Sequence, residues 1–231
     1  MDRGYAWAAS SYATNGYDVG QGVRDTVALP DVVQQVTGRS AGSVLLTGAS
    51  MGGHVVAVAL ERHPDAFAGA MPYCGVLGDT ALFDYQLDAN VTAAAPAGED
   101  IEFAGQPTAR ATDDLTGIPA VRGTPRAPVL SLHDIGDLFV PLSMEQVYAL
   151  RLALHGRSHL FVARAVRGVG HCDFTSAELR QGFDDLVDWV RTGRRPGGDA
   201  ILDRRAVADP AFGCRWTVGI RATFRAPACP E

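Results

Sequence analysis

The stretch Ser43-Val-Leu-Leu-Thr-Gly-Ala-Ser-Met-Gly-Gly53 decides the fold: a short apolar run leads into Gly48-Ala49-Ser50-Met51-Gly52 and then into a helical pattern. A G-x-S-x-G sequence between a strand and a helix is typical of a sharp turn that lifts the serine hydroxyl clear of the backbone. Its two glycines let strand and helix pass without a clash, and the following helix directs its first amides at a place where a negative oxygen is stabilised. Ser50 is therefore a candidate nucleophile; the alternative is a glycine-rich turn that contains a serine by chance.

Apolar runs alternate with amphipathic stretches along the rest of the chain. We expect strands at residues 5–11, 43–47, 68–73, 128–133 and 160–166, and helices at residues 22–36, 53–62, 143–154 and 175–191. Strands separated by single helices predict an α/β fold with a mostly parallel sheet and helices on both faces. The length fits a single domain over residues 1–231. Within it, Pro/Gly clusters predict a loop-rich insertion at 75–126, and the Pro/Gly/Ala-rich residues 195–231 predict a surface tail tied by a Cys214–Cys229 bridge.

Composition excludes several classes of function. The net charge of the 231-residue chain is −6, so we expect no nucleic-acid partner, because phosphate binding needs clustered cations. All 20 basic residues are arginine, which leaves no lysine for a Schiff base or a phosphate-binding loop, and we expect no cofactor. The longest uncharged apolar stretch is interrupted by the Gly-rich turn, so the sequence predicts no membrane span.

The four cysteines are Cys74, Cys172, Cys214 and Cys229. They lack metal-site spacing such as C-x-x-C, so we expect no metal. Their even number favours two disulfides over four free thiols, and two disulfides favour a secreted protein. No signal peptide is visible in the sequence, so any export signal has been removed or lies outside it.

Partners for Ser50 are expected where parallel strands end, because active sites of open α/β sheets gather beyond the carboxyl ends of the strands. The strand at 128–133 runs into a segment with Asp137, and the strand at 160–166 runs into a glycine-flanked segment with His171. The order serine, acid, histidine is that of the α/β-hydrolase triad and differs from the chymotrypsin and subtilisin orders. Asp134 is the alternative acid, and Asp173 is a weaker one because it is too near His171 in sequence.

Five other histidines compete with His171 for the role of base. His63 lies at a helix end and is expected to be an exposed C-terminal cap. His155 and His159 flank a helix-to-strand turn and are expected to be exposed or capping residues. His54 follows Ser50 by one helical turn and is expected to lie beneath the turn. His133 ends a buried strand. His171 is the histidine that the strand order favours.

Three segments resemble the triad segments of serine α/β-hydrolases. They are Gly48-Ala49-Ser50-Met51-Gly52-Gly53, Pro128-Val-Leu-Ser-Leu-His-Asp-Ile-Gly-Asp-Leu-Phe-Val-Pro141 and Gly170-His171-Cys172. The resemblance covers residues 4 to about 192 and extends to bacterial esterases and peptidase-like hydrolases with strands similar to residues 5–12. It implies Ser50 as nucleophile, His171 as base, Asp137 as acid and the Met51 amide as one oxyanion donor.

The Cys172 that follows His171 is similar to the cysteine that tannases and feruloyl esterases bridge to a neighbour of the nucleophile. Here Ala49 occupies that position. The resemblance therefore implies another partner, and Cys74, at the end of the next strand, is the candidate that would tie the histidine segment to the sheet.

The resemblance fails at the front of the chain. A full α/β-hydrolase has further strands before residues 5–11, one of which supplies the second oxyanion amide. The chain is thus expected to be either a fragment or a reduced hydrolase in which residues 5–11 pair directly with the 43–47 strand. In the reduced form the second donor would come from Ser10, Ser11 or Tyr12.

The expected function is hydrolysis of carboxylic esters through an acyl-enzyme. A short or absent lid would leave an open cleft, which would admit small, bulky or polymeric esters such as aromatic polyesters. Tyr12, Tyr73, Phe139 and Phe174 are the expected substrate contacts, with Trp7 nearby. The alternatives are a serine peptidase or amidase with the same triad, and a non-catalytic binding protein. The oligomeric state is not predicted.

Overall fold

The computed structural model describes residues 4–97, 117–221 and 228–230 of the chain. Its strands are β1 (Leu45–Ala49), β2 (Gly69–Tyr73), β3 (Val129–Asp134) and β4 (Phe161–Val166). Its α-helices are α1 (Val19–Thr37), α2 (Met51–Arg62), α3 (Ala81–Ala97), α4 (Ser143–Leu154), α5 (Ser176–Thr192) and α6 (Arg204–Ala208), and two short 3-10 helices are η1 (Ser158–Leu160) and η2 (Cys214–Trp216).

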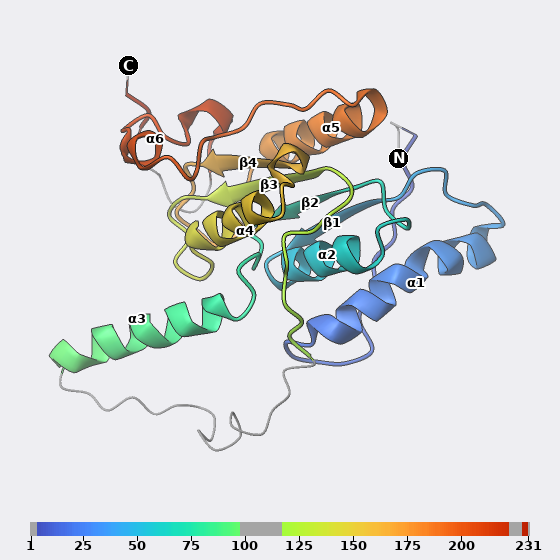
Figure 1. The fold of residues 1–231 in the computed structure, drawn as a ribbon, viewed down its shortest axis with the longest axis horizontal. Coiled ribbons are helices and arrows are strands. Elements are labelled where there is room, and N and C mark those ends of the chain that lie inside the picture. Colours follow the sequence, from blue (N-terminus) through green and yellow to red (C-terminus); the bar gives the residue numbers. More distant parts are fainter. Residues whose placement is uncertain (1–3, 98–116, 222–227, 231) are drawn as a thin grey trace.

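The four strands form one parallel sheet in the order β1-β2-β3-β4 (Figure 1). Ala49 pairs with Tyr73, Tyr73 with Leu132, and Asp134 with Val166, so the carboxyl ends of all four strands lie at one edge. The α/β class with a parallel sheet, predicted from the alternation of strands and helices, is confirmed.

Helices cover both faces of this sheet. Helices α1, α2 and α4 lie on one face and α5 on the other, as Figure 1 shows. Helix α5 begins with a capping box between Thr175 and Glu178 and ends at Gly193 in the left-handed conformation. Its apolar side packs Leu186 and Trp189 against Leu130 of the sheet. Both ends of the helix are thus defined by local sequence.

The segment at residues 5–11 is not a strand, contrary to the sequence-based expectation. It has no regular secondary structure and is largely exposed, and among the described residues β1 pairs with β2 alone. Residues 5–10 and residues 43–47 both line a cavity of about 780 Å³. Residues 5–11 thus lie near β1 but do not pair with the edge of the sheet.

The expected loop-rich insertion at 75–126 contains the helix α3, which projects from the body of the molecule in Figure 1. Its alanine-rich sequence favours a helix, and its proline, Pro96, stands in the last turn. The helix contacts the segment after β3, where Tyr85 Oη donates to the Leu138 carbonyl (3.4 Å) and Gln86 Nε2 to the Phe139 carbonyl (3.3 Å). Residues 98–116 of the insertion lie outside the described residues.

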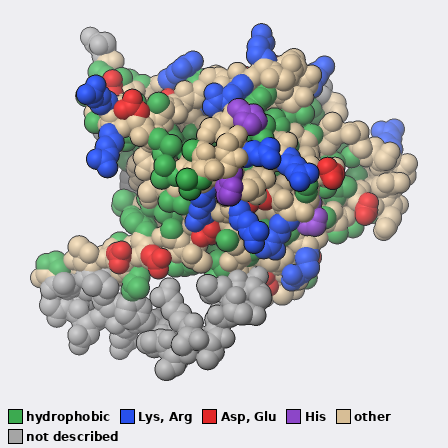
Figure 2. All heavy atoms as spheres, viewed as in Figure 1, with side chains coloured by type: hydrophobic (Ala, Val, Ile, Leu, Met, Phe, Trp, Pro, Cys, Tyr) green, Lys and Arg blue, Asp and Glu red, His purple; other side chains and the backbone are tan. Residues whose placement is uncertain are grey.

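The surface mixes side chains of all types. On the face viewed in Figure 2, basic side chains and histidines are interspersed with apolar and uncharged ones. Within the described parts of the chain, none of the helices combines the length and the apolar character that crossing a membrane requires.

Candidate active site

Ser50 occupies a strained turn between β1 and α2. Its φ of 53° and ψ of −120° lie in a region that residues with a side chain rarely adopt. The turn is held by the Ser50 amide, which donates to the Tyr73 carbonyl (3.2 Å), and by the Gly53 amide, which donates to the Ser50 carbonyl (2.9 Å). A side chain at Gly48 would collide with the backbone carbonyl of Gly52. The strand-to-helix turn that the pentapeptide predicts is therefore present.

The steric requirement falls on only one of the two glycines in the pentapeptide. A Cβ atom at Gly52 would meet no atom within 4 Å, whereas one at Gly53 would lie 2.5 Å from the Gly75 Cα. Close packing of α2 thus needs glycine at Gly48 and Gly53. The expectation that the packing also requires a residue without a side chain at Gly52 is wrong.

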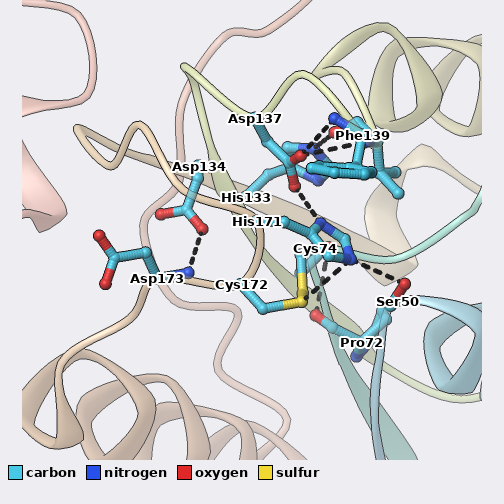
Figure 3. The surroundings of a disulfide bond; sticks show 12 residues. Ser50, Pro72, Cys74, His133, Asp134, Asp137, Phe139, His171, Cys172 and Asp173 are labelled. Atoms are coloured by element: carbon cyan, nitrogen blue, oxygen red, sulfur yellow. Dashed lines mark hydrogen bonds and ion pairs between the residues drawn. A yellow bond between two sulfur atoms is a disulfide. The ribbon is translucent and has the colours of Figure 1, made fainter. Parts of the chain in front are cut away.

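His171 lies between Ser50 and Asp137, as Figure 3 shows. Its Nε2 is 2.8 Å from Ser50 Oγ, and its Nδ1 is 2.6 Å from Asp137 Oδ2. With the ring proton on Nδ1, the imidazole donates to the carboxylate and accepts from the serine hydroxyl. The structure thus brings together the three side chains that the strand ends predicted.

Asp137 is buried and held in place by the backbone of its own loop. Its Oδ1 accepts from the amides of Phe139 (2.9 Å) and Val140 (3.0 Å), which leaves Oδ2 for His171. Asp134, the alternative acid, instead accepts from the Asp173 amide through Oδ2 (2.9 Å), away from the imidazole. Burial raises the pKa of Asp134 to about 7.

A buried ion pair beneath the Asp137 loop is a feature that the sequence analysis missed. His133 Nε2 donates to the Val140 carbonyl (2.7 Å), and its Nδ1 is 3.1 Å from Glu145 Oε1. Burial disfavours the charged ring, but the hydrogen bond and charge of Glu145 outweigh it and raise the pKa of His133. The signal in the sequence is Glu145 itself, an acid on the buried side of α4 beside Met144 and Tyr148.

Two disulfides, Cys74–Cys172 and Cys214–Cys229, account for all four cysteines. These are the two pairs that the sequence analysis inferred. Cys74 and Cys172 both have positive φ values, 44° and 57°. The first disulfide joins the residue after His171 to the residue that follows β2 (Figure 3). Because its sulfurs are bonded to each other, the group Cys74, His171 and Cys172 does not offer thiolates to a metal ion.

The expected substrate contacts are dispersed. Phe139 is 67% exposed, and its ring centroid lies 5.7 Å from that of His171. Tyr73 and Phe174 contact each other edge to face at 5.9 Å and pack against the apolar cluster beneath α5. Tyr12 lines the cavity beside β1, and Trp7 is 78% exposed. Phe139 is thus the member of this set in contact with the imidazole.

Among the described histidines, His171 is the one hydrogen-bonded to Ser50. His54 is buried: its Nε2 donates to the Pro119 carbonyl (2.7 Å) and its Nδ1 accepts from Tyr17 Oη (3.1 Å), while burial lowers its pKa. His63 and His155 are the C-cap residues of α2 and α4, and His159 is exposed in η1.

Comparison with known proteins matches residues 1–192 to the prolyl oligopeptidase family. The chain is 30% identical over 152 residues to o-phthalyl amidase of Xanthobacter agilis, which covers 65% of this chain and 30% of that protein. The fold is similar to that of an acylaminoacyl peptidase of Pyrococcus horikoshii (TM-score 0.56, 16% identity, 81% of this chain and 31% of that one). It is also similar to a puromycin-hydrolyzing peptidase of Mycobacterium tuberculosis (TM-score 0.51, 19% identity, 78% and 27%).

The chain thus spans less than a third of the length of each of these three proteins. The match to the family model covers most of the chain and includes the β1 turn, the Asp137 loop and the His171 loop. The chain belongs to the prolyl oligopeptidase family, within the serine α/β-hydrolase superfamily.

Proposed function

We propose that the protein hydrolyses carboxylic acid esters and amides through an acyl-enzyme, with Ser50 as nucleophile, His171 as base and Asp137 as the acid that orients it. The observation that carries this proposal is the position of His171, with Nδ1 on Asp137 and Nε2 on Ser50. The imidazole takes the Ser50 proton as Oγ attacks the carbonyl carbon, then gives it to the leaving group. Water activated by the same imidazole releases the acyl group.

The developing oxyanion would be stabilised at the start of α2. The Met51 amide is the first of this 12-residue helix and adjoins Ser50. The expectation of a second donor from Ser10, Ser11 or Tyr12 assumed that residues 5–11 pair with β1, and the described residues do not show that pairing. The Tyr12 amide instead donates to Ser10 Oγ at 3.0 Å.

Two observations bear on the substrate. Phe139 is 67% exposed and lies beside His171, and its neighbour Leu138 is 78% exposed. These exposed apolar side chains support esters with bulky apolar groups, including aromatic polyesters. The relative that shares 30% identity is an amidase, which supports amide substrates equally.

The two disulfides support secretion, because such bonds persist in oxidising compartments.

The test compares a p-nitrophenyl ester with the p-nitroanilide of the same acyl group. We expect the wild type to hydrolyse the ester and Ser50→Ala to lose about 10⁶-fold in kcat. The anilide tests amidase activity, because its poorer leaving group depends more on proton donation by His171. Retention of most ester hydrolysis in Ser50→Ala would refute the assignment, and a folded wild type inactive on both substrates would favour the non-catalytic binding protein.

A further inference from the structure

The C-terminal tail lies beyond residues 1–192, the part of the chain that matches the family, and it covers the outer edge of β4. The Asp199 amide donates to the Ala163 carbonyl (2.8 Å), and Asp199 Oδ2 accepts from the Ala165 amide (2.7 Å). Farther along, Thr217 Oγ1 accepts from the Arg167 amide (2.8 Å). The tail therefore turns around the arrowhead end of β4, where the loop that carries His171 begins (Figure 1).

Arg221, in this tail, reaches that loop with a buried guanidinium. Its Nη2 donates to both carboxylate oxygens of Glu178 (2.8 Å each), and its Nε donates to the Asp173 carbonyl (2.8 Å). The Arg221 side chain is only 6% exposed. Asp173 is two residues after His171, so one side chain of the tail joins the histidine loop to the first turn of α5.

The Glu178 carboxylate accepts four hydrogen bonds at that point. Besides Arg221 Nη2, its carboxylate accepts from the Thr175 amide and from the Val218 amide of the tail, each at 2.8 Å. Thr175 Oγ1 in turn donates to the Val218 carbonyl (2.8 Å). A buried carboxylate of this kind depends on its cationic partner, because loss of the cation leaves a charge without compensation.

The backbone around Asp173 is fixed from two sides. Its carbonyl accepts from Arg221, and its amide donates to Asp134 Oδ2 at 2.9 Å, as Figure 3 shows. Cys172, which lies between His171 and Asp173 in the sequence, is bonded to Cys74. Arg221 is the one of these three attachments that lies outside the family-matched residues.

We propose that Arg221 is a positioning residue for the reaction: through Asp173 and Glu178 it holds the histidine loop where the His171 imidazole reaches Ser50. This inference rests on the proposed function. It assigns no contact with substrate to Arg221. A displacement of the imidazole by about 1 Å is enough to reduce the rate about 100-fold, because general-base catalysis depends on the donor–acceptor distance.

The test measures kcat and KM for a p-nitrophenyl ester in Arg221→Ala, Arg221→Lys and, as the matched control, Arg215→Ala. Arg215 belongs to the same tail, but its guanidinium lies over the Trp216 ring. Assays are run well below the melting temperature of each variant, so that all are folded. We expect Arg221→Ala to lower kcat about 10- to 100-fold with KM within about twofold, and Arg215→Ala to keep the wild-type kcat.

Added millimolar guanidinium should restore part of the kcat of Arg221→Ala, which a general loss of stability would not allow. Arg221→Lys keeps the charge but lacks the planar fork that spans Glu178 and the Asp173 carbonyl, so its kcat should stay reduced. If Arg221→Ala does not fold, Arg221→Lys decides the matter. A wild-type kcat in either folded variant would overturn the inference, whereas an inactive wild type would overturn the proposed function instead.

Discussion

The disulfide between Cys74 and Cys172 should contribute more to stability than the second disulfide, and it should also support activity. The perturbation is the double substitution Cys74→Ala with Cys172→Ala, compared with Cys214→Ala with Cys229→Ala. The two bonds close loops with sequence separations of 98 and 15 residues. In the chain-entropy description, closing such loops lowers the entropy of the unfolded chain enough to contribute about 4.7 and about 3 kcal/mol respectively.

The activity effect follows from the backbone of the first pair. Cys74 and Cys172 are both held at positive φ, a region that residues with a side chain rarely adopt. Without the bond, both residues can relax toward negative φ, and Cys172 adjoins His171. We therefore expect the Cys74/Cys172 variant to lose at least about 10-fold in kcat, because the imidazole no longer stays within hydrogen-bond distance of Ser50.

The assay is urea denaturation of the wild type and the two double variants, followed by tryptophan fluorescence, together with ester hydrolysis without denaturant. The free energy of unfolding should fall more in the Cys74/Cys172 variant than in the Cys214/Cys229 variant. The reasoning is refuted if the first variant loses less than about 1 kcal/mol and keeps the wild-type kcat.

Three shorter predictions follow from single residues. Gly48→Ala should destabilise the chain by about 1–3 kcal/mol or prevent folding, because its Cβ meets the Gly52 carbonyl, whereas Gly52→Ala should fold normally in thermal melts. The pKa of Asp134 is raised to about 7, so the folded chain holds a proton that the unfolded chain loses above about pH 4. The free energy of unfolding should therefore fall by up to about 4 kcal/mol from pH 4 to 7. Asp134→Asn should remove this dependence of the free energy of unfolding on pH in urea titrations. Phe139→Ala, which removes an exposed ring beside His171, should raise KM for an aromatic ester severalfold while changing stability by less than about 0.5 kcal/mol; an unchanged KM excludes the contact.

Local patterns in the sequence were sufficient to predict most strands of the sheet and most of its helices. The helix at residues 143–154 has its predicted bounds, and α5 begins one residue after its predicted start because Thr175 acts as its N-cap. The same reasoning placed Asp137 and His171 near Ser50, since parallel strands bring their carboxyl ends to one edge.

Features that depend on distant parts of the chain were missed. The apolar residues 5–11 have a strand-like composition, but strand formation needs a partner edge, and they do not pair with β1. Helix α3 was missed for a different reason. The proline and glycine clusters around it indicated loops, although its alanines favour a helix. The contact of Arg221 with Asp173 joins residues 48 positions apart, and no local pattern marks that arginine among the others.

The central claim is that Ser50 is a nucleophile activated by His171, and the direct measurement is labelling with a fluorophosphonate probe followed by intact-protein and peptide mass spectrometry. The account predicts one adduct per chain, located on Ser50, absent in Ser50→Ala and formed much more slowly in His171→Ala. A folded wild-type chain that takes up no label, or an adduct that persists in Ser50→Ala, would contradict it.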